Sequence, residues 1–312
     1  MSWYSDKKEI WKKIIDSVAN DLKRNPIMIE KDTIQSMFLY ELTKYDFPFV
    51  FKGGTSLSKT YNIINRFSED IDLSLNRKTT ESEKRKSKEI IMNTASKLGL
   101  VLTNPDKVMS RHDYNKYVFV YDSLFSEEKL EIVVETSYFQ ISYPVNKKEI
   151  SSYINSFCKN NNVEMPFEFD AMKFEMNVQS LERTFIDKIF AVCDYKIENM
   201  MDRDSRHLYD IAKIEPMIAY DDDLKELISK VRHDRMNSKN NPSANPKYNI
   251  NEMLKDIIDS DFFKSDYNNI TLKLLYENYS YEDAINNGIK KVQSKELFWG
   301  ILYGKKWEHK RN

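Results

Sequence analysis

Residues 51–57, Phe-Lys-Gly-Gly-Thr-Ser-Leu, and residues 70–75, Asp-Ile-Asp-Leu-Ser-Leu, determine the fold expected for this chain. The first stretch continues an apolar run at residues 47–51, which predicts a buried strand. Thr55 and Ser56 offer the side chains of a helix N-cap and predict a short helix after the turn. The alternation within residues 70–75 predicts a second strand. The expected local order is strand, Gly-Gly turn, helix, strand.

The Gly53-Gly54 pair stands out because the chain of 312 residues contains only six glycines. Adjacent glycines in such a sequence predict a place where backbone freedom or close approach is required. The backbone amides of Gly54, Thr55 and Ser56 at a helix start would form a donor cluster at the positive end of the helix. We therefore expect phosphate to bind at this turn.

Asp70 and Asp72 are expected on one face of their strand, since positions i and i+2 point the same way with Cα atoms about 6.5 to 7 Å apart. Ile71 and Leu73 would then point into the core. Two carboxylates at this spacing can bridge one or two Mg²⁺ ions, which prefer oxygen ligands and phosphate. Zinc fits less well, because none of the four histidines has metal-ligand spacing. Amides on one side and Mg²⁺ on the other would hold an NTP with its α-phosphorus exposed to a hydroxyl.

The overall composition indicates a globular protein without a strong charge bias. Hydrophobic residues make up 41% of the chain, and 48 Lys and Arg balance 49 Asp and Glu. This balance argues against a wholly basic nucleic-acid coat and against an acidic disordered tail. Cys158 and Cys193 lie far apart, so neither a disulfide scaffold nor a thiolate zinc site is supported. Without an apolar run near the ~20 residues that span a bilayer, we expect a cytoplasmic location and no membrane partner.

The pattern of elements changes along the chain and predicts the α+β class. Residues 114–121 and 129–138 favour a β-hairpin, whereas the sequence after residue 178 is mostly helical. Residues 236–249 are rich in Asn, Ser and Pro, which exclude a packed regular element and predict a loop. The expected helices cover residues 7–24, 26–45, 80–98, 180–200, 203–214, 222–236, 250–260 and 279–298.

Three motifs, in order, resemble those of a known family. They are residues 51–57 with 66–73 (RFSEDIDL), residues 183–191 (RTFIDKIFA) and residues 203–211 (RDSRHLYDI). The sequence resembles the AbiEii/AbiGii-type nucleotidyltransferase toxins, which include the MenT toxins and belong to the DNA polymerase β-like nucleotidyltransferases. The resemblance covers residues 31–215, and the last hundred residues match only in being helical. Asp187 departs from the family pattern, where Glu more often precedes the lysine.

The resemblance implies a polymerase β-like core with a mixed sheet in residues 1–178 and a helical domain in residues 179–312 that contributes site residues. It makes Lys188 essential and places Asp210 facing the site, where it would support catalysis or the metal shell. Charge arithmetic agrees, since a helix-borne lysine could neutralise the β/γ end of a triphosphate. The alternative is that both residues are exposed helix charges or salt-bridge partners. Arg206 would orient Asp210, contact phosphate, or be an exposed arginine.

A third acid is expected on a neighbouring strand, as is usual among polymerase β-like enzymes. Glu131 and Glu135 share a face of the strand at residues 129–138, and we favour Glu135 because its neighbours predict a central buried strand. The alternative is that Glu135 pairs with an arginine such as Arg66. Ser68 is expected to hydrogen-bond near the site or contact phosphate, or else to be a turn residue.

Two basic stretches, residues 77–97 and 290–311, are candidates for contact with the acceptor. Trp299, Tyr303 and Trp307 interleave the second stretch, a pattern compatible with RNA binding or with a solvated helix face. The resemblance implies NMP transfer from an NTP to the tRNA 3′ end, which would block aminoacylation and stall translation. It also implies a cognate antitoxin, in a toxin–antitoxin or phage abortive-infection system. Two alternatives are nucleotidylation of a protein hydroxyl and a non-catalytic binding protein with a degenerate nucleotidyltransferase fold.

Overall fold

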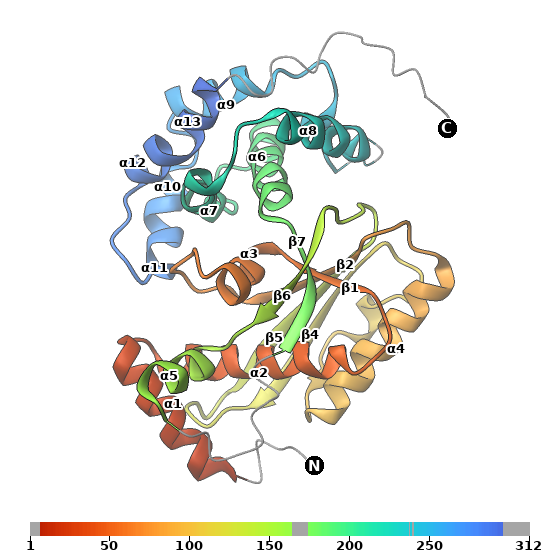
Figure 1. Cartoon of the computed structure of the whole chain (residues 1–312), viewed down its shortest axis with the longest axis vertical. Helices are drawn as coiled ribbons and strands as arrows, with labels where there is room; N and C mark the ends of the chain where they lie inside the picture. Colours follow the sequence, from red (N-terminus) through yellow and green to blue (C-terminus); the bar gives the residue numbers. More distant parts are fainter. Residues whose placement is uncertain (1–6, 164–173, 237, 239, 296–312) are drawn as a thin grey trace. The chain divides into compact units, whose positions relative to one another are not determined.

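The computed structural model describes residues 7–163, 174–236, 238 and 240–295, and the chain forms two compact units, Met1–Ser180 and Leu181–Asn312 (Figure 1). Cys158 and Cys193 are both buried and free. Among the described residues, the helices include none with the length and apolar character needed to cross a bilayer. The first unit is a sheet covered by helices, and the second is helical, which confirms the α+β class.

In its described part, the first unit contains a seven-stranded mixed sheet in the order β3-β4-β5-β2-β1-β7-β6. Strand β2 pairs with β5 in parallel, as does β1 with β7, and the other pairs are antiparallel. The expected hairpin is therefore present as β4 and β5. The strands are β1 (Phe49–Lys52), β2 (Asp70–Leu75), β3 (Val101–Leu102), β4 (Tyr114–Asp122), β5 (Lys129–Ser137), β6 (Val145–Ile150) and β7 (Phe174–Gln179).

One face of this sheet forms the core of the unit. Ile71 and Leu73 of β2 are fully buried together with Ile132 and Val134 of β5. They pack with apolar residues of α2 (Pro26–Thr43) and α4 (Glu81–Lys97), which cover this face (Figure 1). Full burial of each aliphatic side chain stabilises the fold by about 1.5 to 3 kcal/mol. A register slip by one residue would place the β2 carboxylates in this core, so the register of β2 is strongly specified.

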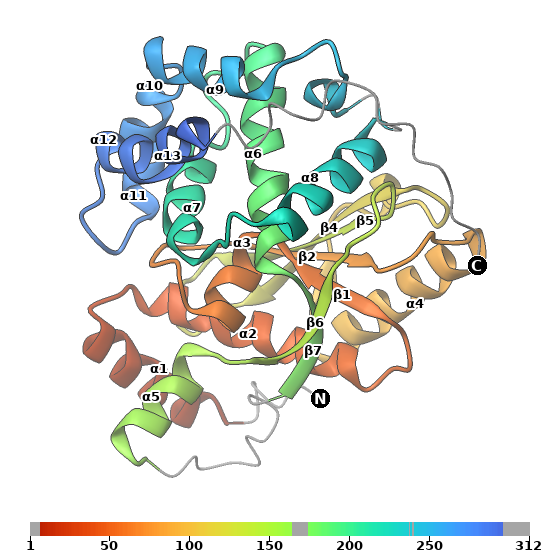
Figure 2. The ribbon, with the colours of Figure 1, turned by 45° about the horizontal axis from the view of Figure 1, so that its top comes forward.

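A smaller apolar cluster joins three helices of the first unit. Trp11, Ile15 and Val18 of α1 (Lys8–Leu22) pack with Ile29 of α2 and with Ile154 of α5 (Tyr153–Asn161). The three helices lie side by side (Figure 2). Helix α2 begins where Asn25 accepts a hydrogen bond from the Ile27 amide (2.9 Å), with Pro26 as its first residue. Proline is favoured at this position because its missing N–H would have no helical partner.

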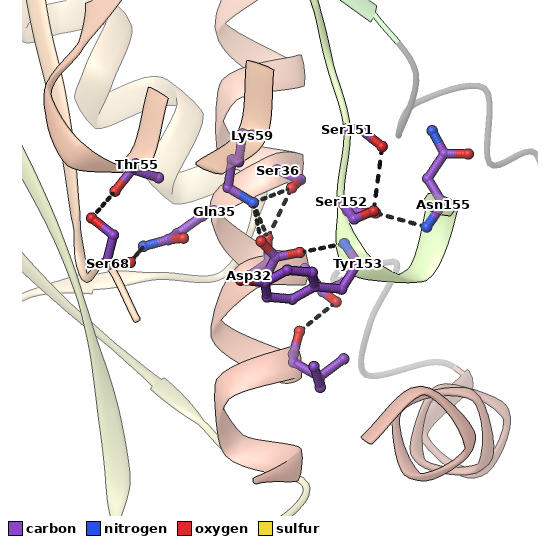
Figure 3. Close-up of polar contacts among 12 residues, drawn as sticks. Asp32, Gln35, Ser36, Thr55, Lys59, Ser68, Ser151, Ser152, Tyr153 and Asn155 are labelled. Atoms are coloured by element: carbon purple, nitrogen blue, oxygen red, sulfur yellow. Dashed lines mark hydrogen bonds and ion pairs between the residues drawn. The ribbon is translucent and has the colours of Figure 1, made fainter. Parts of the chain in front are cut away.

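A buried ion pair connects α2 to the helix that follows the Gly-Gly turn (Figure 3). The Lys59 ammonium binds the Asp32 carboxylate, the Asp32 carbonyl (3.0 Å) and the Ser36 hydroxyl (2.7 Å). The Tyr153 amide donates to the other Asp32 oxygen (2.9 Å), and the Ser151 amide donates to the Lys59 carbonyl (3.0 Å). Burial lowers the pKa of Lys59, and the Asp32 charge opposes this effect. The pair thus fixes α2, the Gly-Gly helix and the start of α5 to one another.

The second unit consists of packed helices, of which α6 and α7 carry the residues expected at the site. Gly288 lies at a kink against α7, where an added Cβ would lie 3.1 Å from the Ala212 nitrogen, a tighter contact than most side chains make. The elements are α6 (Leu181–Ile197), α7 (Arg206–Ile214), α8 (Asp222–Arg235), α9 (Ile250–Asp259), α10 (Lys264–Asp266), η7 (Tyr267–Thr271), α11 (Leu272–Leu274), α12 (Tyr281–Ala284), η8 (Ile285–Ile289) and α13 (Lys290–Ser294).

The polar stretch predicted as a loop is packed in its described part. Its described residues form a loop, as predicted, with one short helical turn at Pro242–Ala244, but Ser243 and Ala244 are buried, so the composition did not exclude packing. Buried Arg232 of α8 donates to the carbonyls of Ala244 (3.0 Å) and Tyr248 (2.8 Å). The Ser243 amide donates to Asp194 of α6 (2.8 Å). Charged side chains from two helices therefore order a segment that has few apolar residues.

Candidate active site

The Asp72 carboxylate lies directly against the Gly-Gly turn. A Cβ atom built on Gly53 would be 1.9 Å from Asp72 Oδ2, and Gly53 has a φ of +75°, which disfavours other residues. Both features require glycine at position 53. The expected convergence of this carboxylate with the turn is therefore present within the first unit.

The helix after the turn begins directly at the glycines. It comprises α3 (Gly53–Ser56) and continues as η2 (Leu57–Tyr61), with Lys52 as an N-cap whose side chain makes no capping hydrogen bond. The expectation that Thr55 and Ser56 cap the helix is wrong, because both already lie inside its first turn. Their hydroxyls serve other partners: Ser56 Oγ donates to the Gly53 carbonyl (2.8 Å), and Thr55 contacts the start of β2.

Thr55, Ser68 and Gln35 connect the turn to the segment that leads into β2. Thr55 Oγ1 donates to Ser68 Oγ (2.9 Å), and Gln35 Nε2 donates to the carbonyls of Ser68 (3.3 Å) and Glu69 (2.7 Å) (Figure 3). Ser68 also lies 2.9 Å from the position that a Gly54 Cβ would occupy. Ser68 is thus part of a hydrogen-bonded contact with the Gly-Gly helix.

Gly54 permits the close approach of a buried arginine. Its added Cβ would be 2.6 Å from Arg66 Nη2, and Arg66 is only 2% exposed. Arg66 Nη1 donates to the Phe67 carbonyl (2.8 Å). The guanidinium therefore lies against the backbone of the turn and brings positive charge to the place where phosphate was expected.

Strand register places Glu135 beside the two aspartates. Asp72 is paired with Glu135 across β2 and β5, and Asp70 is paired with Val133, so all three acids are on one face of the sheet. Glu131 is exposed and, in the parallel register, lies before the start of β2, which favours Glu135 over Glu131. Glu135 forms its ion pair with Lys116 of β4 (3.5 Å), and not with Arg66 as the alternative supposed.

Tyr114, Lys116 and Lys52 are polar residues of this face that sequence reasoning missed. Burial, the charge of Glu135 and a hydrogen bond with it raise the pKa of Tyr114, and the charges of Asp72 and Asp70 add to the effect. All three acids therefore disfavour ionisation of the Tyr114 hydroxyl. Lys52 is paired with Asp72 across β1 and β2. The only signal in the sequence was alternation, which puts Tyr114 and Lys116 opposite the buried residues of β4.

The carboxylates on this face are oxygen donors of the kind that Mg²⁺ prefers. Within the described part of the chain, no three His, Cys, Asp or Glu side chains are grouped so that they could hold a metal ion. Mg²⁺ does not need three, since it is usually bound by one or two carboxylates with phosphate oxygens and water. Asp70 and Asp72 offer hard oxygen donors of this kind, and they fit a magnesium ion that arrives with a nucleotide.

In the second unit, Lys188 and Asp210 form a buried ion pair. Lys188 Nζ of α6 is 2.7 Å from Asp210 Oδ2 of α7, and the side chains are 7% and 0% exposed. The alternative that both are exposed helix charges is therefore wrong, and they are salt-bridge partners. Like the Lys59–Asp32 pair, it is costly to desolvate, and the loss of either partner alone would leave an uncompensated buried charge.

Arg206 and Asp187 make ion pairs different from those expected of site residues. Arg206 Nη2 contacts Asp204 Oδ1 (3.0 Å), so the expectation that Arg206 orients Asp210 is wrong. Asp187, the departure from the family pattern, binds Arg183 (3.0 Å) and Arg235 (3.1 Å). Asp187 thus belongs to an ion-pair network that holds α6 against α8.

His207 contacts the same lysine and stays neutral at physiological pH. Its Nδ1 atom lies 3.3 Å from Lys188 Nζ. Burial and the positive charge of Lys188 lower the pKa of His207 to about 3. The unfolded chain binds a proton below its ordinary pKa of about 6.5, whereas the folded chain does not. Stability from this group is therefore complete above pH 6.5 and is lost as the pH falls toward 3.

His207→Asn is expected to remove part of the acid sensitivity of folding. Between pH 6.5 and pH 5 the wild type should lose about 2 kcal/mol more unfolding free energy than the variant, at about 1.4 kcal/mol per pH unit. Urea denaturation at the two pH values measures this difference. His112→Asn, at an exposed position, is the control and should keep the wild-type loss. Equal losses in wild type and His207→Asn would contradict the prediction.

The first basic stretch is partly engaged within its own unit. Lys84 is 9% exposed and binds Glu81 and Asp113, both at 2.7 Å, and Lys88 Nζ donates to the Val108 carbonyl (2.9 Å). These two lysines are therefore held by α4 and the segment before β4. Trp299, Tyr303 and Trp307 of the second basic stretch lie outside the described residues.

Comparisons with known proteins agree with the motifs. A family model described as "Nucleotidyl transferase AbiEii toxin, Type IV TA system" matches residues 38–287. A crystal structure from H. pylori, described as a candidate nucleotidyltransferase, has a TM-score of 0.47 at 18% identity, over 89% of this chain and 97% of that chain. JHP933 from Helicobacter pylori has a TM-score of 0.43 at 18% identity, over 89% and 94%. No curated protein is significantly similar in sequence.

Proposed function

The chain belongs to the AbiEii nucleotidyl transferase toxins of type IV toxin–antitoxin systems, and we propose that it transfers NMP from an NTP to an RNA acceptor, the 3′ end of tRNA, in a Mg²⁺-dependent reaction. The observation that carries this proposal is the Asp72 carboxylate against Gly53, with Asp70 and Glu135 on the same face of the sheet. Acids beside a helix start are suited to a metal-bound triphosphate.

The first unit supplies the metal and the phosphate contacts of the proposed site. Asp70 and Asp72 would hold Mg²⁺, which when bound neutralises phosphate charge and makes the α-phosphorus more electrophilic. The amides at Gly53, Gly54 and Thr55 would cradle phosphate, because the positive end of the helix dipole attracts anions. Ser68 connects Thr55 to the segment before β2 and so holds this helix start in place.

Glu135 is proposed to accept the proton of the attacking hydroxyl. A carboxylate next to Asp72 can take this proton as the new bond to the α-phosphorus forms and the bond to pyrophosphate breaks. Tyr114 and Lys116 hold Glu135 from the neighbouring strand. Glu131 faces solvent and is given no role.

Lys188 of the second unit is proposed to bind the nucleotide. Lys188 would neutralise the β/γ end of the triphosphate, and Asp210 orients the lysine ammonium and supports catalysis. Arg206 is proposed as a phosphate contact, since its side chain is 28% exposed and it does not bind Asp210.

The proposed product explains toxicity. A nucleotide added to the tRNA 3′ end would block aminoacylation and stall translation, so the cell would need a cognate antitoxin protein.

To test this function, purified protein is incubated with total RNA, a candidate protein and each of the four α-labelled NTPs, with Mg²⁺ or EDTA, and the products are resolved on denaturing gels. We expect label on tRNA-sized RNA with Mg²⁺ only. Label on protein would replace the RNA acceptor by a protein hydroxyl, and no label would support a non-catalytic binding protein.

Lys188→Ala is expected to weaken nucleotide binding by about 10- to 100-fold, because a charge-assisted contact with phosphate contributes about 1.5 to 3 kcal/mol. Equilibrium binding of a non-hydrolysable NTP measures the effect. Lys196→Ala is a matched control, since Lys196 lies on the same helix and pairs with Asp256 (3.0 Å). Unchanged nucleotide affinity in Lys188→Ala would remove the triphosphate role from this residue.

A further inference from the structure

A cluster of three titratable side chains joins α6 to α7 in the second unit. Lys188 Nζ is 2.7 Å from Asp210 Oδ2 and 3.3 Å from His207 Nδ1. His207 precedes Asp210 by three residues, so both reach the ammonium from the same face of α7. The proposed function uses Lys188 and Asp210 but gives His207 no role.

The contact with the lysine determines the tautomer of His207. An ammonium group donates hydrogen bonds and cannot accept one, so Nδ1 must be the acceptor and the ring proton must be on Nε2. A neutral ring is consistent with the lowered pKa of His207. Asp210 and His207 thus hold one ammonium, the first with a negative charge and the second without one.

The His207 ring is supported by the helix that carries the lysine. Tyr195 of α6 stacks on it, with ring centroids 6.0 Å apart and planes at 8°. The Tyr195 hydroxyl donates to Asp204 Oδ2 (3.2 Å). The Ser205 amide at the start of α7 donates to buried Asp266 (3.1 Å). These contacts fix both the ring and the first turn of its helix, so Nδ1 has a defined position.

We propose that His207 is a positioning residue for Lys188, which holds the ammonium beside Asp210 without cancelling its charge. The inference rests on the proposed function, in which Lys188 binds triphosphate. A single carboxylate can attract an ammonium from many directions, whereas two acceptors at different positions define its place. A second carboxylate would also define the place, but it would offset the positive charge that the phosphate needs.

Three substitutions of His207 separate position from charge. His207→Asn keeps a neutral acceptor near the position of Nδ1, and His207→Leu removes the acceptor. His207→Asp has the shape of the Asn variant but carries a negative charge. In steady-state NMP transfer, we expect the KM for NTP in the Asn variant to stay within about threefold of wild type. The Leu and Asp variants should raise this KM by about tenfold, with kcat changed less. If His207 had a purely structural role, the KM values of the three variants would instead change in parallel with their thermal stabilities.

A second readout does not depend on activity. ¹⁵N NMR of the histidine rings, with His207→Asn as the assignment control, should show His207 with its proton on Nε2. A proton on Nδ1, a wild-type KM in the Leu variant, or equal KM values in the Asn and Asp variants would overturn the inference. If His207→Leu does not fold, the comparison of Asn with Asp still decides. Failure of the wild type to bind or transfer any nucleotide would instead contradict the proposed function.

Discussion

Asp70→Asn is expected to reduce NMP transfer by on the order of 10³-fold and to leave the fold intact. Asparagine keeps the shape of the side chain but lacks the charge that Mg²⁺ requires. The position is only partly buried, and its neighbours Ile71 and Leu73 form the core on the opposite face, so we expect the variant to fold. Incorporation of α-labelled NTP into RNA measures the loss, and circular dichroism verifies the fold.

The control for this experiment is Asp122→Asn, at the end of β4. Asp122 is 82% exposed and pairs with Lys129 (3.2 Å), so its charge lies in solvent and its removal should not change transfer. Glu135→Gln should follow Asp70→Asn, whereas Glu131→Gln should follow the control. Wild-type incorporation by Asp70→Asn would reject the metal site, and a loss limited to Glu131→Gln would reassign the third acid.

Lys59→Met is expected to lower the free energy of unfolding by about 3 to 5 kcal/mol, because it leaves a buried carboxylate without its counter-charge. The lysine and aspartate side chains are 1% and 8% exposed. The Asp32 carboxylate would keep the hydrogen bond from the Tyr153 amide but would lose its charged partner. Urea denaturation followed by circular dichroism measures the change.

The double variant Asp32→Asn, Lys59→Met tests the cause of this loss. It removes both charges and keeps an acceptor for the Tyr153 amide, so it should recover at least half of the stability lost in Lys59→Met. Lys129→Met removes one member of an exposed pair in the same unit and should be indistinguishable from wild type. If the double variant lost as much unfolding free energy as the two single variants lose in sum, packing, and not charge, would hold this site together.

The sequence predicted the elements in which local pattern and chemistry agree. Residues 70–75 form β2 with the expected bounds, since each aspartate would be too costly to bury and the alternating aliphatic residues require one core face. The approach of Asp72 to Gly53 was also predictable, because the turn and the strand are close in sequence. The roles proposed for Lys188 and Asp210 came from resemblance to a family, and their pairing required the structure.

Other features depended on contacts that no local pattern encodes. Lys59 and Asp32 are 27 residues apart, and a lysine within a short helix normally predicts an exposed position. Strand β6 carries Lys147 and Lys148 and lies at the edge of the sheet, where exposed lysines are compatible with a strand but do not predict one. Glu135 and Asp72 are neighbours only because β5 pairs with β2 in parallel.

The parallel pairing of β1 with β7 has a consequence for biosynthesis. Strand β7 spans Phe174–Gln179 and lies between β1 and β6 in the sheet. A nascent or truncated chain that stops before residue 174 would therefore leave β1 as an edge strand with unpaired backbone groups on one side. On the ribosome, the sheet of the first unit can therefore be completed only after these residues emerge from the exit tunnel. Any fragment intended for expression of this half alone must extend through Gln179.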